Sequence, residues 1–268
     1  MPAFICVTCG TQFAPTEAPP DLCPICTDDR QFLPPGGQTW TTAEALRGSH
    51  LNAWRQHEPD LFGIGTAPAF AIGQRALLVR TPHGNVLWDC ITLLDEATVT
   101  LVRALGGLSA IAISHPHYYS GMVDWAQAFG CPVWLHAADR AHVMRPDPAL
   151  RFWSGARHDL LPGLTLIHAP GHFDGAAMLH WAQGADGAGA LLAGDIVQVA
   201  ADRRTAGFMR SYPNWIPLGP AAVRRIAGAV APFAFERVYG AWWDRAIPAD
   251  GKAAVERSVA RTLRWLAD

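Results

Sequence analysis

The sequence lacks several features that would assign it to a special class of protein. No apolar run reaches the roughly 18 residues that a membrane-spanning helix needs, and the first ten residues, MPAFICVTCG, do not resemble a secretory signal. Charged residues make up only 16% of the 268 positions, and the net charge of −2 comes with no long basic run or acidic tail. We therefore expect a cytoplasmic globular protein with a small-molecule substrate, and neither a nucleic acid nor a membrane surface as partner.

Cysteine is scarce, but four of the six cysteines form two C-x-x-C pairs, Cys6 with Cys9 and Cys23 with Cys26. Two such pairs supply four thiolates, which is the usual ligand set of a structural zinc ion. A segment of about 35 residues is too short to build an apolar core, so the metal would supply its folding energy. A reducing cytosol disfavours the alternative of two disulfides. Residues 1–36 are thus predicted to be a small zinc ribbon, called the four-cysteine module below.

The two pairs also resemble rubredoxin, which holds iron in the same geometry, through the segments CVTCG and CPIC. Thr27 follows the last cysteine where rubredoxin usually has glycine, and this difference favours zinc. Residues 1–36 contain one arginine and no lysine, so this module is not expected to bind nucleic acid. Packing against the main domain, or in a homodimer, is the better expectation. Cys90 and Cys131 lie in apolar surroundings and are predicted to pack in the core.

The stretch Leu33–Gly37 contains two prolines and two glycines and is interpreted as a linker to a second domain, residues 37–268. Apolar runs and helical patterns alternate in this domain, which is typical of a layered α/β fold. The predicted strands are 76–80 and 85–89, forming a hairpin, followed by 109–114, 133–136, 164–168, 178–181 and 190–193. The predicted helices are 94–105, 122–129, 220–230 and 252–266.

Polar residues with metal-ligand chemistry follow three of these strands. His115 and His117 come after the buried strand 109–114, and in extended backbone their side chains would share one face. His172 follows a Pro-Gly turn after strand 164–168, and Asp195 follows the strand that ends at Gly194. Three imidazoles and one carboxylate at strand ends suit zinc or ferrous iron.

The order of these motifs resembles the metallo-β-lactamase superfamily. That family has a strand followed by [T/S]-H-x-H-x-D-H-x-G, then P-G-H, then a strand ending in G-D. The segments SHPHYYSG, APGHFDG and LLAGDI occur here in the same order, and the similarity covers roughly residues 65–245. The resemblance implies an αβ/βα four-layer sandwich, here preceded by the zinc ribbon.

The sequence departs from the family at the ligands of a second metal ion. Tyr119 stands where the family has aspartate, and Ser120 stands where it has a third histidine. A histidine near the C-terminus is also absent, because the last one is His180 and the segment Tyr239–Trp243 occupies the expected place. These three differences together predict a site with one ion. The ion would be Zn²⁺ or Fe²⁺, on all four ligands or on a triad of His115, His172 and Asp195.

The resemblance implies hydrolysis of a small ester, lactone, thioester or phosphoester by metal-activated water. Because the usual basic aspartate is missing, Tyr118, Tyr119 and Asp174 are the predicted catalytic residues. His136, Arg204 and Arg210 are predicted to contact the substrate. Two alternatives stay open: a mononuclear non-haem iron oxidoreductase similar to persulfide dioxygenases, and a non-catalytic scaffold that binds a metal or ligand without turnover.

Overall fold

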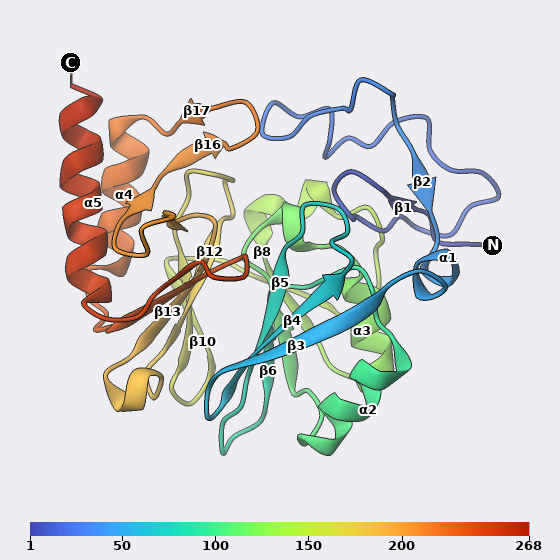
Figure 1. Ribbon diagram of the computed structural model, residues 1–268, viewed down its shortest axis with the longest axis horizontal. Helices are drawn as coiled ribbons and strands as arrows, with labels where there is room; N and C mark the ends of the chain where they lie inside the picture. The colour runs from blue at the N-terminus through green and yellow to red at the C-terminus, as the bar shows by residue number, and fades with distance from the viewer. Residues whose placement is uncertain (268) are drawn as a thin grey trace. The chain divides into compact units, whose positions relative to one another are not determined.

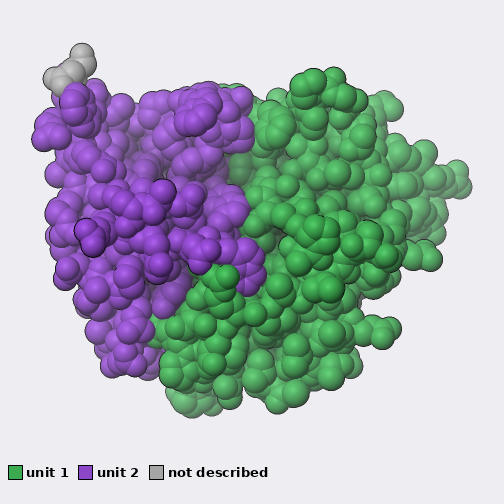
Figure 2. All heavy atoms as spheres, viewed as in Figure 1, with its two compact units in different colours: residues 1–135, 140–152 green, residues 136–139, 153–268 purple. Residues whose placement is uncertain are grey.

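The computed structural model describes residues 1–267, and the chain divides into two compact units (Figure 2). Unit 1 comprises Met1–Leu135 and Arg140–Phe152, and unit 2 comprises His136–Asp139 and the chain from Trp153 on. The predicted boundary after residue 36 lies inside unit 1. That residues 1–36 form a separate domain therefore stays a prediction.

The N-terminal module consists mostly of turns, held by one short pair of strands. Strand β1 (Ile5–Cys6) pairs antiparallel with β2 (Trp40–Thr41), so the chain after the predicted linker returns to the module. Phe13 and Ile25 are buried beside the cysteines, and the Phe13 and Trp40 rings meet edge to face at 5.0 Å. With so few apolar side chains, the four thiols make up much of the module's core.

Unit 1 is built on a seven-stranded sheet in the order β3-β4-β5-β6-β7-β8-β9. Strands β3 to β6 are antiparallel neighbours, whereas β6, β7 and β8 run parallel. Their bounds are β3 Leu51–Glu58, β4 Leu61–Ala67, β5 Arg75–Val79, β6 Val86–Trp88, β7 Ala110–Ala112, β8 Val133–His136 and β9 Leu150–Trp153. The predicted hairpin at residues 76–89 is confirmed as β5 and β6.

The helices of unit 1 begin and end at residues that stabilise those positions. Helix α2 (Glu96–Ala104) begins after Asp95, whose carboxylate accepts a hydrogen bond of 2.7 Å from the Thr98 amide. Helix α3 (Met122–Phe129) ends at Gly130, which has the left-handed conformation common after helices. Both helices were predicted from the sequence. The shorter helical segments are α1 (Ala43–Arg47), η1 (Pro116–Tyr118) and η2 (Ala137–His142).

Unit 2 contains a six-stranded sheet in the order β10-β11-β12-β13-β18-β19. Only β13 and β18 are parallel neighbours. The bounds are β10 Arg157–Leu161, β11 Leu164–His168, β12 Ala177–Trp181, β13 Ala190–Gly194, β18 Arg237–Gly240 and β19 Ala246–Ile247. The predicted strands 164–168, 178–181 and 190–193 are confirmed.

Two helices cover this sheet. Helices α4 (Pro220–Val230) and α5 (Gly251–Trp265) pack against each other, α4 contacts β11, and α5 contacts β18 (Figure 1). The apolar core of unit 2 lies under them and includes Leu191, Ile226 and Val255. Smaller elements complete the unit, namely η3 (Ala185–Gly187), β14 (Gln198–Val199), β15 (Ala206–Gly207), β16 (Met209–Ser211) and β17 (Ile216–Pro217).

None of the helices in residues 1–267 combines the length and the apolar character that crossing a bilayer requires. The longest of them, α5, has 15 residues and carries charged side chains along its length.

Candidate metal centres

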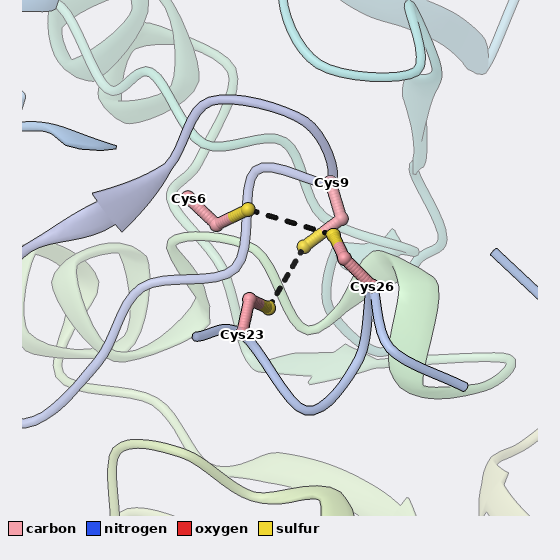
Figure 3. A group of neighbouring side chains, drawn as sticks. All are labelled: Cys6, Cys9, Cys23 and Cys26. Carbon is pink, nitrogen blue, oxygen red and sulfur yellow. Dashed lines mark hydrogen bonds between the residues drawn. The ribbon is translucent and has the colours of Figure 1, made fainter. Parts of the chain in front are cut away.

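The four cysteines of the N-terminal module converge on one point, with their sulfur atoms directed toward one another (Figure 3). The Sγ atoms of Cys6 and Cys26 lie 3.6 Å apart, and those of Cys9 and Cys23 lie 3.7 Å apart. Four sulfurs around a tetrahedral ion at about 2.3 Å would be separated by about 3.8 Å. All four cysteines are buried, so the predicted four-cysteine metal site fits the geometry observed.

Backbone hydrogen bonds shape the two turns that carry these thiols. The Gly10 amide donates to the Cys6 carbonyl, and the amides of Cys26 and Thr27 donate to the Cys23 carbonyl. Gln38, which sequence reasoning missed, bridges both pairs. Its Nε2 donates to Cys6 Sγ at 3.2 Å, and its Oε1 accepts from the Cys23 amide at 3.1 Å.

Hydrogen bonds among the thiols favour ionisation of two of them. The pKa of Cys6 is lowered chiefly by the hydrogen bond from Cys23, and the pKa of Cys23 is lowered chiefly by the one from Cys26. The hydrogen bond with Cys23 raises the pKa of both Cys9 and Cys26, so without an ion the four thiols share their protons unequally. Metal binding requires thiolates, and an ion would displace the protons that remain. Outside the module, Cys90 and Cys131 are buried as predicted, and burial raises the pKa of Cys131 to about 11.

His115 and His117 follow strand β7, but the backbone between them differs from the prediction. The expectation of an extended segment is wrong, because only His115 is extended and Pro116–Tyr118 form a 3₁₀ turn. Proline at the first position of that turn loses no hydrogen bond, and its ring fixes a suitable φ. Both rings are still buried, and their centroids lie 5.2 Å apart. The turn therefore brings the two imidazoles close together, as was expected of extended backbone.

The segment leading to His115 is anchored by residues that sequence reasoning did not single out. Asp89 is buried, and its Oδ1 accepts a hydrogen bond of 2.8 Å from the Ser114 amide. The Ser114 hydroxyl lies 3.0 Å from His115 Nδ1, and the Tyr118 ring meets the His115 ring edge to face at 4.6 Å. These contacts fix the orientation of the His115 imidazole.

His172 lies in the loop after β11, and Asp195 directly follows β13, in the chain order predicted. His172 Nε2 is 3.9 Å from Asp195 Oδ2. His172 Nδ1 lies 3.0 Å from the Met209 carbonyl. Because a carbonyl can only accept, Nδ1 carries the proton and Nε2 is left as the metal-binding atom.

Asp195 is held through its backbone by Tyr212, another residue that the sequence did not indicate. The Tyr212 hydroxyl donates to the Asp195 carbonyl at 2.7 Å. Burial, followed by the nearby Asp195 charge, raises the pKa of Tyr212. The phenol therefore remains a donor throughout the neutral pH range.

His115, His117, His172 and Asp195 form a group whose potential ligand atoms all lie within 4.8 Å of one another, and all four residues are buried. Three imidazole nitrogens and one carboxylate oxygen match the donors that zinc and ferrous iron accept. In residues 1–267 this group and the four cysteines are the two sets of three or more such side chains close enough to hold an ion.

Tyr119 and Ser120 stand at positions that would help to hold a second ion in the metallo-β-lactamase superfamily, and here they have other contacts. Tyr119 and Ser120 are both buried. Ser120 Oγ accepts a hydrogen bond of 3.1 Å from Gln74 Nε2, and the Ser120 carbonyl accepts one of 3.2 Å from the Gln12 amide. Ser120 is therefore a structural anchor in this chain.

The segment Tyr239–Trp243 occupies the place where the metallo-β-lactamase superfamily has its C-terminal histidine. Strand β18 runs parallel to β13, with Gly240 beside Gly194, and the Ala241 amide donates to the Gly194 carbonyl at 3.1 Å. The segment Tyr239–Trp243 thus lies next to the strand end that carries Asp195, and it offers no imidazole or carboxylate.

The predicted catalytic residues occupy two kinds of environment. Tyr118 and Tyr119 are buried, Tyr118 against His115 as described. Asp174 is exposed in the loop after His172, and its carbonyl accepts a hydrogen bond of 2.8 Å from His168 Nε2. Their catalytic roles stay predictions.

The predicted substrate-contact residues are also spread out. His136 is buried, stacked on His168 at 3.9 Å and edge-on to Trp153 at 4.6 Å. Burial, with a smaller contribution from the His168 charge, lowers the pKa of His136 to about 4. Arg204 is exposed in the turn after β14, whereas Arg210 is half-buried in β16, next to the Met209 carbonyl that holds His172. Substrate contact stays a prediction for all three.

No protein family model matches the chain. It is 47% identical over 268 residues to the uncharacterized protein YmaE of Bacillus subtilis (strain 168), covering 99% of this chain and 97% of YmaE.

Solved structures with a similar fold include several metallo-β-lactamases. The DIM-1 enzyme has a TM-score of 0.60 at 13% identity, covering 81% of this chain and 98% of its own. The VMB-1 enzyme has a TM-score of 0.59 at 10% identity, covering 80% and 97% respectively. An enzyme from Hirschia baltica has a TM-score of 0.56 at 15% identity, covering 79% and 97%. Such low identities show the fold alone. The chain therefore belongs to the same family as YmaE and has the metallo-β-lactamase fold, preceded by an N-terminal four-cysteine module.

Proposed function

We propose that this protein is a metal-dependent hydrolase that uses a single ion, held by His115, His117, His172 and Asp195. The observation that carries the proposal is the group of four buried nitrogen and oxygen donors within 4.8 Å of one another. Tyr119, Ser120 and the segment Tyr239–Trp243 replace the ligands of a second ion, which supports one ion instead of two. The neighbours named metallo-β-lactamases support metal-dependent hydrolysis in general terms.

A divalent cation in such a site polarises a substrate oxygen and lowers the pKa of a coordinated water to about 7. The chain itself supplies orientation. The Met209 carbonyl holds the proton on His172 Nδ1, and Ser114 and Tyr118 fix the His115 ring. Buried ligands also keep bulk water from competing for the donors.

Proton transfer needs a group other than the family's aspartate. We assign this role to Asp174, because it is an exposed carboxylate two residues after His172 and can exchange protons with solvent. The phenols of Tyr118 and Tyr119 are proposed to donate a hydrogen bond to the oxyanion that develops on the substrate.

The substrate we propose is a small ester, lactone, thioester or phosphoester. Arg210, beside the Met209 carbonyl, is the proposed contact for an anionic group, with Arg204 and His136 as further contacts. A cytoplasmic location, the absence of nucleic-acid and membrane partners, and a homodimer belong to the same proposal.

The test is turnover by zinc-loaded protein of chromogenic ester, lactone, thioester and phosphodiester substrates. We expect hydrolysis of at least one class, a loss of about 100-fold or more in His172→Ala, and in Asp174→Asn a loss of about 100-fold at neutral pH. The exposed Asp60→Asn variant is the matched control and should retain full activity.

Two results would contradict the proposal. Oxygen consumption by iron-loaded protein with a persulfide, without hydrolysis of any ester class, would favour the iron oxidoreductase. Tight metal binding without turnover of either kind would favour a binding scaffold.

A further inference from the structure

We propose that Gln12 is a positioning residue that couples the four-cysteine module to the loop carrying His115 and His117. Metal on the four cysteines then strengthens metal binding at the histidines. The inference rests on the proposed function in one respect, that an ion binds at His115, His117, His172 and Asp195. Its structural part, the restraint of residues 114–121 by Gln12, stands independently of that ion.

Gln12 is tied closely to the cysteine turn. It lies three residues after Cys9. The carbonyl of the preceding residue, Thr11, accepts a hydrogen bond of 3.0 Å from the Cys6 amide. The Thr11 hydroxyl also lies 3.3 Å from Cys9 Sγ. A change in the position of Cys6 or Cys9 is therefore transmitted to Gln12 through only two residues.

The other side of Gln12 faces the segment that follows His117. Its backbone amide donates to the Ser120 carbonyl at 3.2 Å. Its side-chain Nε2 donates to Asp124 Oδ2 at 2.8 Å, and its Oε1 accepts from Arg145. Arg145 in turn forms an ion pair of 2.6 Å with Asp124. Gln12 is only 5% exposed, so each polar end of its amide has a partner where water is largely excluded.

Consecutive turns connect Ser120 to His117 without a flexible stretch. Pro116–Tyr118 form the 3₁₀ turn, the Tyr119 amide donates to the Pro116 carbonyl, and the Met122 amide donates to the Tyr119 carbonyl. The Gln12 backbone amide restrains the Ser120 carbonyl, and its side-chain amide restrains Asp124 in the first turn of α3. Both restraints therefore act on the position of the His117 ring, and the second depends on the Gln12 side chain.

A second contact braces the same region. The Thr92 hydroxyl donates to the Gly10 carbonyl at 2.8 Å, and Gly10 has a φ of +79°. The Thr92 carbonyl lies so close to Gly121 that an added Cβ there would be 2.6 Å away. The cysteine turn and the start of α3 are therefore both packed on Thr92.

This arrangement gives the cysteine site a role beyond holding its own module together. A bound ion would fix the positions of the four cysteines and so constrain the turn that carries them. Without the ion, the segment also lacks the binding free energy that stabilises its fold. Partners that orient metal ligands from outside typically change metal affinity 10- to 100-fold. By linkage, an ion at the histidines also strengthens binding at the cysteines by the same factor.

The test compares wild type with Gln12→Met, which keeps the side-chain length and the backbone donor but removes the amide group. Gln12→Ala is the second variant. The control is Thr16→Ala, which removes an exposed hydroxyl of the same module that donates to the Ala18 carbonyl. Cobalt titration with a competing chelator reports both sites separately, since a four-sulfur site and a site of nitrogen and oxygen donors have different spectra.

We expect cobalt to bind the histidine site about tenfold more weakly in Gln12→Met, with the sulfur site still filled, and with unchanged affinity in Thr16→Ala. Amide hydrogen exchange of residues 114–121 should be faster in Gln12→Met even without metal. Equal exchange rates and equal cobalt affinity would overturn the inference. A wild-type protein that binds no ion at the histidines would refute the proposed function, and the exchange measurement would still decide the role of Gln12.

Discussion

Individual residues around the proposed ion are positioned by a backbone carbonyl in one case and by side-chain hydroxyls or rings in the others. His172 is oriented by the Met209 carbonyl, and Asp195 is held through its own carbonyl by Tyr212. A backbone carbonyl can come from any residue, so the contact that orients His172 places no requirement on the side chain at position 209. The Tyr212 hydroxyl that holds Asp195 comes from 17 residues further along the chain. For that reason these contacts leave no signature in the sequence, although the ligands themselves do.

Replacing Tyr212 with phenylalanine tests this anchoring. The change removes one buried hydrogen bond to the Asp195 carbonyl, so we expect the free energy of unfolding to fall by about 1 kcal/mol. Metal affinity at the histidine site should fall with it, because Asp195 loses its restraint. Urea denaturation and a zinc competition assay measure the two effects, and an unchanged protein in both assays would contradict the role given to Tyr212.

The buried His136 predicts a pH dependence of stability. Its pKa is lowered to about 4 in the folded protein, whereas an unfolded histidine has a pKa near 6.5. Between these values the unfolded chain binds more protons, so the free energy of unfolding should decrease as pH falls from about 6.5 toward 4.

Urea denaturation of wild type, His136→Phe and the exposed control His83→Gln over this pH range checks the prediction. The loss of stability in acid should be smaller in His136→Phe, by at most about 3 kcal/mol, and unchanged in His83→Gln. Parallel curves for wild type and His136→Phe would show that His136 is not held neutral.

At the scale of elements, the approach of Gly121 to Thr92 fixes where α3 begins. A Cβ at Gly121 would lie 2.6 Å from the Thr92 carbonyl oxygen, a backbone atom that cannot move away easily. We expect Gly121→Ala to destabilise the protein by about 1–3 kcal/mol. In Gly228→Ala, within α4, the new methyl group meets nothing within 4 Å, so the higher helix propensity of alanine should stabilise by about 0.5–1 kcal/mol. Thermal denaturation distinguishes the two; equal shifts would refute the close contact.

The elements that the sequence predicted correctly are those with strong local signals. Met122–Phe129 ends at a glycine, Val133–His136 is a short apolar run, and Pro220–Val230 has apolar residues at helical spacing. The hairpin of β3 and β4 was missed, because the solvent-facing sequence LNAWRQHE has little apolar alternation. The β16–β17 hairpin was missed because its strands are only three and two residues long.

The strength of the local sequence signal also separates the site residues that were predicted from those that were not. His115, His117, His172 and Asp195 each lie in a short motif at a strand end. Gln12 and Gln38 lie in no motif, and Gln12 acts on Asp124, 112 residues further along the chain. Contacts of this kind depend on how the fold brings distant segments together, which local sequence does not contain.

For the whole molecule, two candidate metal centres of different chemistry predict two different responses to a chelator. Removing metal from the cysteines should increase hydrogen exchange throughout residues 1–40, because few apolar side chains hold that segment. Strands β11 and β13, within the apolar core of unit 2, should keep their protection. Uniform loss of protection across the chain would contradict a module stabilised by its own metal.

The number of metal ions per chain tests the proposed single-ion centre most directly. Elemental analysis of purified protein saturated with metal should find about two ions per chain, one on the cysteines and one on the histidines. His115→Ala and Cys9→Ser should each lose about one of them under the same conditions. About three ions in the unmodified protein would contradict the proposal, since that count requires a second ion beside His115, His117, His172 and Asp195.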